Sequence, residues 1–314
     1  MKKLSKIEFA EIRNWVHRNA RPFGLALWQY NFENGSKEAV ISALSFYQNA
    51  DGGFGNALEP DCWNPDSSPY TTLFAIRELE ELNFTNIDHP IMQGIFKFLE
   101  SGVHSSENGW LFSIPSNDGY PRAPWWTYSI EENKKESMGV SAGIIKFIFK
   151  FADKSSGLYK RASSIAEKLL AEIDAPDIYL SETGVDGYIK LKDIILQTGL
   201  TDKFDMEHIS KTIKKLVNDS IERDVSKWQY HCKKPSSFIS SPGSEFYEGN
   251  EEIMEKELDY IIDTRHKNGV WDIDWSWGEQ YPKEFAVTEN WWKAETAINP
   301  IKLLRNFDRI DNLN

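Results

Sequence analysis

Carboxylate side chains gather at two places in the sequence, and tryptophan lies among them at both. The first place holds the acids Glu59, Asp61 and Asp66, just before a helix that we expect to begin at residue 69. Carboxylates near the N-terminus of a helix are stabilised as anions, which suits a base, a nucleophile or a cation ligand. Glu59 and Asp61 are therefore candidate catalytic residues. Asp66 and the neighbouring Trp63 are candidate ligand-binding residues, unless the carboxylates only cap and brace their loop.

The second place is the segment of residues 271–279, in which acids alternate with indole rings. Rings beside carboxylates fit sugar binding through stacking and hydrogen bonds, and they equally fit the stabilisation of a carbocation by π faces. Alternation sends the acids to one side and the rings to the other, so a loop held to a helix by its rings is the other interpretation. Asp274 is the third candidate catalytic residue, and the candidate ligand-binding residues are Asp272, Trp275 and Trp277.

A proline-rich connection carries three further aromatic candidates, Trp125, Trp126 and Tyr128. Such rings can close over a pocket as a lid, and plain packing is the alternative. The chain has no glycine-rich phosphate loop, nucleophile elbow or His-Glu-x-x-His string, so the sequence leaves any cofactor unknown. Asp61, Cys62, His231 and Cys232 have the ligand types of a zinc site but not its spacing, and we predict no metal.

The composition narrows the class of partner. The 314 residues carry a net charge of −12 and no block of lysine and arginine, so nucleic acid is not an expected partner. Two distant cysteines indicate neither a disulfide framework nor a zinc module. No apolar run approaches the roughly 20 residues that span a bilayer. We expect a cytoplasmic protein that binds a small molecule.

Amphipathic helices joined by glycine-aromatic loops must position these residues. The helix over residues 137–151 is apolar on nearly all sides, which is typical of a buried helix, and Trp291 and Trp292 are expected to pack at the start of the last helix. We see no sustained alternation that would predict strands in quantity. The expected helices cover residues 4–19, 25–30, 36–48, 69–82, 91–99, 137–151, 159–173, 188–197, 206–217, 253–263 and 290–307.

One loop organises the chain. Gly52 and Gly53 supply backbone angles that other residues resist, and Asp51 can satisfy their turn by a local hydrogen bond. Gln48 can bond orphan groups at the end of the preceding helix, and Phe54 can fold back onto that helix.

A weaker copy of this loop covers residues 265–271. Aligning Gly269 with the first glycine of the earlier loop places Arg265 in the position of the glutamine and Trp271 in that of the phenylalanine. Helical hairpins that repeat in this way must stack to bury their apolar faces, in an open superhelix or in a ring. The nearly all-apolar helices favour the ring. We therefore predict a single all-α domain over residues 1–314, an α/α toroid of at least five helical hairpins.

The loop with Gln48, Gly52 and Phe54 resembles the glutamine-tryptophan repeat of triterpene cyclases, with phenylalanine in place of tryptophan. The Gly-Gly-Phe-Gly string is also similar to that of protein prenyltransferase β-subunits. Both families belong to the α/α-toroid superfamily, in which concentric layers of helices enclose a central cavity. The segments 58–69, 271–277 and 291–293 are more specifically similar to uncharacterised bacterial prenyltransferase-like toroid proteins.

This resemblance runs from about residue 36 to the C-terminus and is strongest in residues 44–82 and 258–310. It implies a fold and no particular reaction. Triterpene cyclases carry Asp-x-Asp-Asp, whereas the string that begins at Asp272 lacks the final acid. Protein prenyltransferases bind zinc through Asp-x-Cys and a distant histidine, whereas Asp61 and Cys62 are adjacent here. Neither functional set transfers residue by residue.

The leading expectation for function is a small, largely apolar ligand, isoprenoid-like, in a cavity lined by acids and rings. Two alternatives stay open. The protein is a carbohydrate-active hydrolase or lyase that uses paired carboxylates, since (α/α) barrels house such enzymes as well, or it is a non-catalytic binding or scaffold protein. A pocket with paired carboxylates favours sugars, a dry aromatic pocket favours isoprenoids, and a filled core favours a scaffold.

Overall fold

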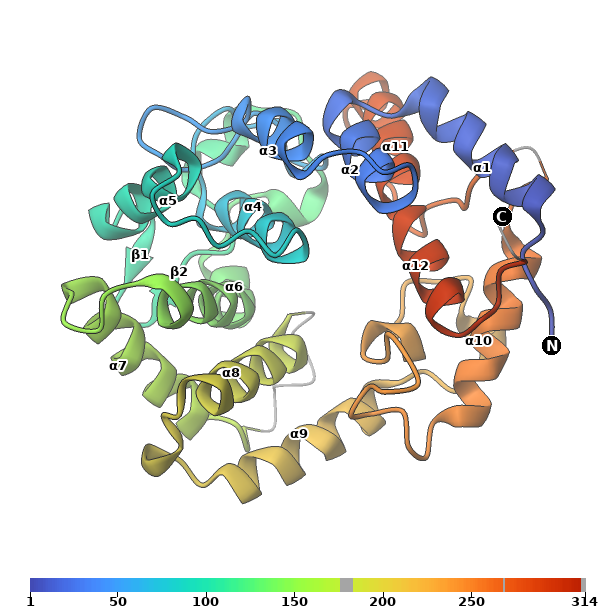
Figure 1. Cartoon of the computed structure of the whole chain (residues 1–314). Coiled ribbons are helices and arrows are strands. Elements are labelled where there is room, and N and C mark those ends of the chain that lie inside the picture. The colour runs from blue at the N-terminus through green and yellow to red at the C-terminus, as the bar shows by residue number, and fades with distance from the viewer. Residues whose placement is uncertain (176–182, 268, 312–314) are drawn as a thin grey trace. The chain divides into compact units, whose positions relative to one another are not determined.

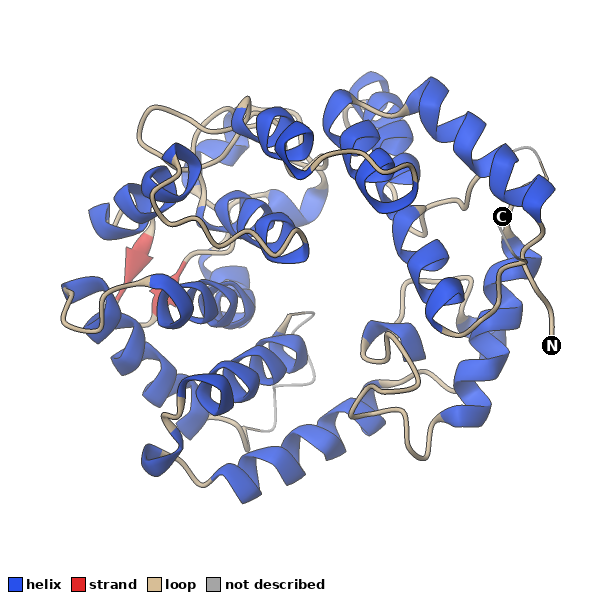
Figure 2. Cartoon of the chain, in the orientation of Figure 1, coloured by secondary structure: helices blue, strands red, loops and turns tan. Residues whose placement is uncertain are grey.

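The structure is a computed structural model that describes residues 1–175, 183–267 and 269–311. Helices make up most of it (Figures 1 and 2), and the paired strands in the described part are β1 (Ser105–Ser106) and β2 (Gly109–Trp110). The prediction of an all-α fold is confirmed. The α-helices are α1 Lys6–Asn19, α2 Pro22–Phe32, α3 Lys37–Ser45, α4 Pro69–Glu81, α5 Pro90–Ser101, α6 Ile130–Phe151, α7 Gly157–Ala171, α8 Gly184–Thr198, α9 Met206–Ser220, α10 Glu251–Thr264, α11 Pro282–Thr296 and α12 Ile298–Asn306.

Short 3₁₀ turns lie in the connections between these helices. They are η1 Pro115–Gly119, η2 Pro124–Trp126, η4 Thr201–Lys203, η5 Val225–Lys227 and η6 Pro235–Ser237. The chain divides into two compact units. The first unit comprises Met1–Ala43 with Val217–Asn314, and the second unit comprises Leu44–Leu216. The single toroidal domain stays a prediction.

Layered helices build the second unit. In it α4 contacts α6, and α6 contacts α8, while α5 and α7 contact each other in a further layer (Figure 1). Glycines let the helices of the first layer approach closely: a Cβ on Gly143 would lie 2.6 Å from Leu73 Cδ1, and one on Gly187 would lie 2.6 Å from Met138 Sδ. The apolar residues of α6 from Val140 to Phe149 are buried, as the sequence pattern predicts.

The caps of several helices follow the sequence. Ser68 Oγ accepts a hydrogen bond from the Thr71 amide at the start of α4, and Ser36 Oγ accepts one at the start of α3. Gly199 ends α8 in the left-handed conformation, with φ of 69°.

The organising loop joins its own turn to a neighbouring helix. Gln48 Nε2 donates to the Gly52 carbonyl at 2.9 Å and to the Ile91 carbonyl of α5 at 3.0 Å, so this side chain holds α5 rather than the end of α3. Gly52 has φ of 93°, and a Cβ on it would lie 2.0 Å from the Gly94 carbonyl oxygen. Asp51 Oδ1 accepts from the Gly53 amide, as predicted.

The loop near the C-terminus repeats this arrangement with other side chains. Arg265 Nη1 donates to the Gly269 carbonyl at 3.0 Å, which is the bond that the glutamine makes in the organising loop. Its Nη2 reaches Glu11 of α1 at 2.9 Å, so this loop also ties a second helix. Asn268 lies outside the described residues. Arg265 and Gln48, which the alignment places at equivalent positions, thus each donate a hydrogen bond to the carbonyl of the glycine four residues later.

Two of the predicted helices differ most from the structure. The helix expected from residue 137 begins at Ile130 instead, because Ser129 caps it by accepting from the Glu132 amide and acids occupy its first turn. The single helix expected over residues 290–307 is two helices, α11 and α12. Pro300 cannot donate a backbone hydrogen bond, so it fits the first turn of a new helix and not the interior of a long one.

Trp291 and Trp292 therefore lie inside α11, not at the start of a helix. The Arg21 guanidinium lies over the Trp291 ring at 5.3 Å, and its Nε bonds Glu295 Oε1 at 2.5 Å. Both partners of this ion pair are buried. Gly24 makes room for it, because a Cβ there would lie 2.9 Å from Glu295 Cγ.

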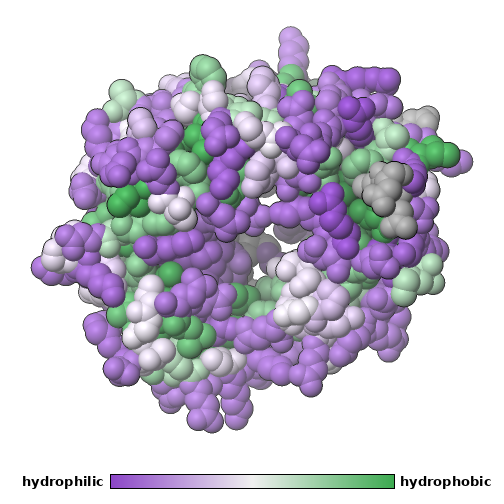
Figure 3. All heavy atoms as spheres, viewed as in Figure 1, coloured by the Kyte–Doolittle hydropathy of each residue, from purple (hydrophilic) through white to green (hydrophobic). Residues whose placement is uncertain are grey.

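Hydrophilic side chains cover most of the face shown in Figure 3, with small apolar patches between them. Within the residues that the structure describes, no helix has both the length and the apolar character needed to cross a membrane.

We predict that Gly52→Ala lowers the free energy of unfolding by about 2 kcal/mol or more, because it combines a strained positive φ with a backbone clash. Urea unfolding followed by circular dichroism measures the change. Gly119→Ala is the matched control in the same unit, since a Cβ there meets nothing within 4 Å. It should change stability by less than about 0.5 kcal/mol. Equal losses in the two variants would contradict this account of the loop.

Candidate functional site

A pocket of about 430 Å³ lies within the first unit. We call it the acidic pocket. It brings together α10, the segment that contains η5 and η6, and the loop before α11. The residues of chemical interest among those that line it are Trp228, Lys234, Glu257, Tyr260, Asp274 and Trp275.

The loop of residues 271–277 alternates as the sequence predicts. Trp271, Ile273 and Trp275 are less exposed than the acids between them. Trp271 Nε1 donates to the Ile261 carbonyl at 2.7 Å and so holds the loop to α10. Trp275 lines the acidic pocket, and its ring meets Trp292 edge to face at 5.6 Å. Trp271 thus fastens the loop, and both rings line the pocket.

Glu257 is the buried acid of the pocket. It is 1% exposed, and it accepts hydrogen bonds from the Ser236 amide at 2.7 Å and the Ser236 hydroxyl at 2.5 Å. Burial raises the pKa of Glu257 to about 6, although the bonds from Ser236 and the charge of Lys234 act in the opposite direction. A carboxyl group with this pKa exchanges its proton close to neutral pH.

The surroundings of Asp274 favour its ionised form, in contrast to those of Glu257. Its carboxylate lies 3.4 Å from His231 Nδ1 and 3.6 Å from Lys234 Nζ. The hydrogen bond with His231 and the charge of Lys234 lower the pKa of Asp274, against partial burial. Lys234 thus influences both acids, and the pocket holds one carboxyl group that keeps a proton more readily and one that gives it up more readily. Such divergence is the arrangement expected of an acid and base pair.

The other two predicted residues of this loop have different surroundings. Asp272 also lines the acidic pocket, and it pairs with Lys293 at 2.8 Å and with His266 at 2.6 Å. The hydrogen bond from Lys293 and that from His266 lower the pKa of Asp272. Trp277 is 1% exposed and packs against Tyr281 and Phe285. The structure therefore brings Asp272, Asp274 and Trp275 together at one pocket and places the Trp277 ring in the core.

In the second unit, the acids of the first cluster separate. Glu59 and Asp61 are 4% and 3% exposed, inside their loop. The Asp61 carbonyl accepts from the Ala123 amide at 2.8 Å, and Trp63 Nε1 donates to the Pro60 carbonyl at 3.1 Å. The first bond ties the backbone of the loop to the proline-rich connection, and the second lies within the loop. The roles of the Glu59 and Asp61 carboxylates stay predictions.

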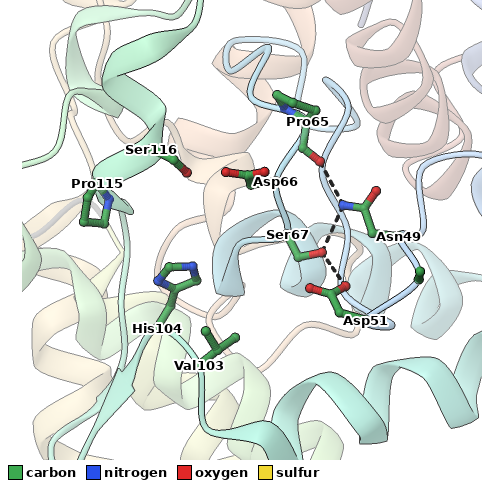
Figure 4. Close-up of a pocket in the computed structure, with 10 residues that line it drawn as sticks. Asn49, Asp51, Pro65, Asp66, Ser67, Val103, His104, Pro115 and Ser116 are labelled. Atoms are coloured by element: carbon green, nitrogen blue, oxygen red, sulfur yellow. Dashed lines mark hydrogen bonds between the residues drawn. The ribbon is translucent and has the colours of Figure 1, made fainter.

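Asp66 is exposed and lines a different pocket, of about 670 Å³, shown in Figure 4. Asp51 and His104 also line it. Ser67 Oγ, on the same wall, donates to Asp51 Oδ1 at 2.7 Å and accepts from Asn49 at 3.0 Å (Figure 4). Burial lowers the pKa of His104, while the charges of the two acids oppose that shift. The hydrogen bonds at this pocket hold the organising loop in shape.

The predicted lid residues differ among themselves. Trp125 is 39% exposed, whereas Trp126 is 4% exposed and stacks on Phe112 at 4.6 Å. The Tyr128 amide donates to Asp118 Oδ1 at 3.0 Å. Trp126 thus belongs to the core of the second unit, whereas Trp125 is exposed and Tyr128 is half-buried.

Comparison of the sequence with known proteins identifies no relative: no model of a known protein family matches the chain, and no curated protein matches it significantly. Within residues 1–175, 183–267 and 269–311, no group of three or more His, Cys, Asp or Glu side chains is placed to hold a metal ion.

Sequence reasoning missed Glu257, Ser236 and Lys234. A signal for the first was present, because Glu257 lies midway between Ile253 and Ile261 on the apolar stripe of α10. A charged residue inside such a stripe is costly to bury unless it is paired or protonated. Ser236 and Lys234 lie in an irregular segment that offers no periodic pattern, so only the folded chain reveals them.

We predict that Glu257→Gln changes how stability depends on pH. Since the pKa of Glu257 is raised from 4.5 to about 6, its stabilising contribution is complete below pH 4.5 and is lost as the pH rises through about 6. The full shift corresponds to about 2 kcal/mol. Between pH 4 and pH 7 the natural protein should lose up to about 2 kcal/mol of stability through Glu257, and the variant should not. Urea unfolding of both proteins at both pH values measures this difference.

Glu252→Gln is the matched control on α10, because Glu252 is exposed and its pKa is lowered by Lys256. It should not reproduce the effect. Parallel pH profiles for the natural protein and Glu257→Gln would show that Glu257 does not titrate in this range.

Proposed function

We propose that the acidic pocket binds a small ligand rich in hydroxyl groups, of the carbohydrate class, and that Glu257 and Asp274 act on it as acid and base. One observation carries the proposal: a single pocket contains two carboxyl groups whose surroundings move their pKa values in opposite directions. Hydrolysis of a glycosidic bond needs such a pair, with one group protonated and the other ionised.

The walls of the pocket support the same class of ligand. Trp275 and Tyr260 offer rings on which the apolar face of a sugar can stack. Trp228 is buried and packs edge to face on Tyr260. Lys234 and Ser236 add polar atoms that can fix the orientation of hydroxyl groups. A mixture of rings with a few polar groups is typical of small-molecule sites.

The roles follow from the proton balance. Glu257 would give its proton to the oxygen of the departing group as the bond to carbon breaks. Ser236 holds the carboxyl group in place, and for the transfer Oε1 must exchange its bond with the Ser236 hydroxyl for one with the ligand. Asp274, held ionised by His231 and Lys234, would take the proton of the attacking water, and the new C–O bond forms to that water.

We also propose that the whole chain is an α/α toroid of the terpenoid cyclase and prenyltransferase superfamily. The layered helices of the second unit support this, and so does the shared hydrogen bond of the two glycine-aromatic loops, from Gln48 to Gly52 and from Arg265 to Gly269.

A second candidate ligand is a largely apolar, isoprenoid-like molecule. The observation that favours it is the number of rings at the acidic pocket, where Trp271 joins the three already named. Aromatic faces stabilise a carbocation, and a protonated Glu257 would then be the acid that generates it.

A binding screen followed by thermal unfolding separates the candidates. We expect oligosaccharides to raise the melting temperature of the natural protein, because a ligand at 100 times its Kd adds about 2.7 kcal/mol of stability. Trp275→Ala should weaken binding about tenfold through the loss of a stacking ring. Phe46→Ala, which removes an exposed ring of the other unit, is the matched control and should bind normally.

Turnover tests the acid and the base. With an oligosaccharide that binds, Glu257→Gln and Asp274→Asn should each reduce the release of reducing ends by about a hundredfold or more. Stabilisation by isoprenoid alcohols and not by sugars would support the second candidate. Binding of a sugar without turnover by the natural protein would indicate a non-catalytic binding protein. No stabilisation by either class would overturn both candidates.

A further inference from the structure

Three basic side chains converge on neighbouring helices of the second unit. Arg77 lies on α4, Lys146 on α6 and Lys190 on α8. The helices approach closely because Gly143 of α6 faces α4 and Gly187 of α8 faces α6. Side chains on the adjoining faces of these helices therefore come within electrostatic range of one another.

Carboxylates neutralise two of these three charges. Lys146 Nζ lies 2.9 Å from Glu80 Oε2, and Lys190 forms an ion pair with Asp186. The guanidinium of Arg77 lies over the Tyr70 ring at 5.9 Å. Its Nε is buried, and among the described residues it has no hydrogen-bond acceptor. Most buried polar groups in proteins have a partner, so this donor points to an acceptor that the described residues do not supply.

The positive charges of these side chains repel one another, and a bound anion would offset that repulsion. Burial lowers the pKa of Lys190, and the positive charges of Arg77 and Lys146 lower it further, while Asp186 acts against them. The side chains of Lys146 and Lys190 are 25% and 19% exposed, so a ligand can reach them from solvent. An oxyanion placed between them would favour the charged form of every cation in the cluster.

We propose that Arg77, Lys146 and Lys190 form a binding site for an oxyanion, the phosphate or carboxylate group of a small ligand. The planar guanidinium matches either group with parallel N–H donors, and the lysines add point charges from the two adjacent helices. Glu80 and Asp186 hold the lysine side chains in position, and Arg77 lies against Tyr70 with its Nε still open to an acceptor. This site lies in the second unit and is independent of the acidic pocket.

Titration calorimetry with inorganic phosphate and, separately, with acetate tests the site in the full chain. We expect binding of at least one anion, and the stronger of the two identifies the ligand group. Arg77→Gln and Lys190→Gln should each weaken binding about tenfold or more, since each removes a charge-assisted hydrogen bond. Lys160→Gln, an exposed lysine of α7, is the matched control and should bind as the natural protein does.

Stability without anions separates a binding role from a structural one. Arg77→Gln relieves the crowding of positive charge, so in anion-poor buffer it should melt at the same temperature as the natural protein or higher. A lower melting temperature for Arg77→Gln would identify Arg77 as a structural residue and overturn the proposal. So would the absence of binding of both anions to the natural protein, or equal affinity in the natural protein and both variants.

Discussion

The structure depends on a bond between a side chain and a glycine carbonyl four residues later. Gln48 makes it to Gly52, and Arg265 makes it to Gly269. In each loop the same side chain also reaches a neighbouring helix, through the Ile91 carbonyl in one and Glu11 in the other. A loop closed in this way fixes both the turn and the helix that packs beside it. Glycine is required where the backbone of the neighbouring helix comes close, as Gly94 does to Gly52.

This constraint explains why the fold was more predictable than the site. Helix caps and the glycine loops are local, so the bond of Asp51 could be predicted from the residues beside it. The caps at Ser68 and Gly199 likewise depend on their neighbours in the sequence. The helix boundaries that were wrong also have local causes, a cap at Ser129 and a proline at residue 300. The prediction followed the apolar periodicity and gave these two signals too little weight. The closed ring is a long-range arrangement and stays a prediction.

The candidate site mixes predicted and unpredicted residues for a physical reason. Asp274 and Trp275 share a short segment, so their alternation was visible in the sequence. Glu257 comes from a helix and Ser236 from an irregular segment, and nothing local says that these two meet. Burial raises the pKa of Glu257, and burial is a property of the folded chain. Glu59 and Asp61 could be selected from their place before a helix, whereas their burial in the loop could not be predicted.

Burial has opposite consequences for the two kinds of charged group in this protein. A buried carboxyl such as Glu257 moves toward its protonated, neutral form, and so becomes a proton donor near neutral pH. A half-buried amine such as Lys190 moves toward its neutral form as well, and nearby cations add to that shift. Under the two proposals, a ligand would use the reactivity of the first group, and an oxyanion would neutralise the positive charge around the second. Each unit thus holds charged groups away from their ordinary state, and a ligand of the matching chemistry would lower the free energy of that unit by restoring it.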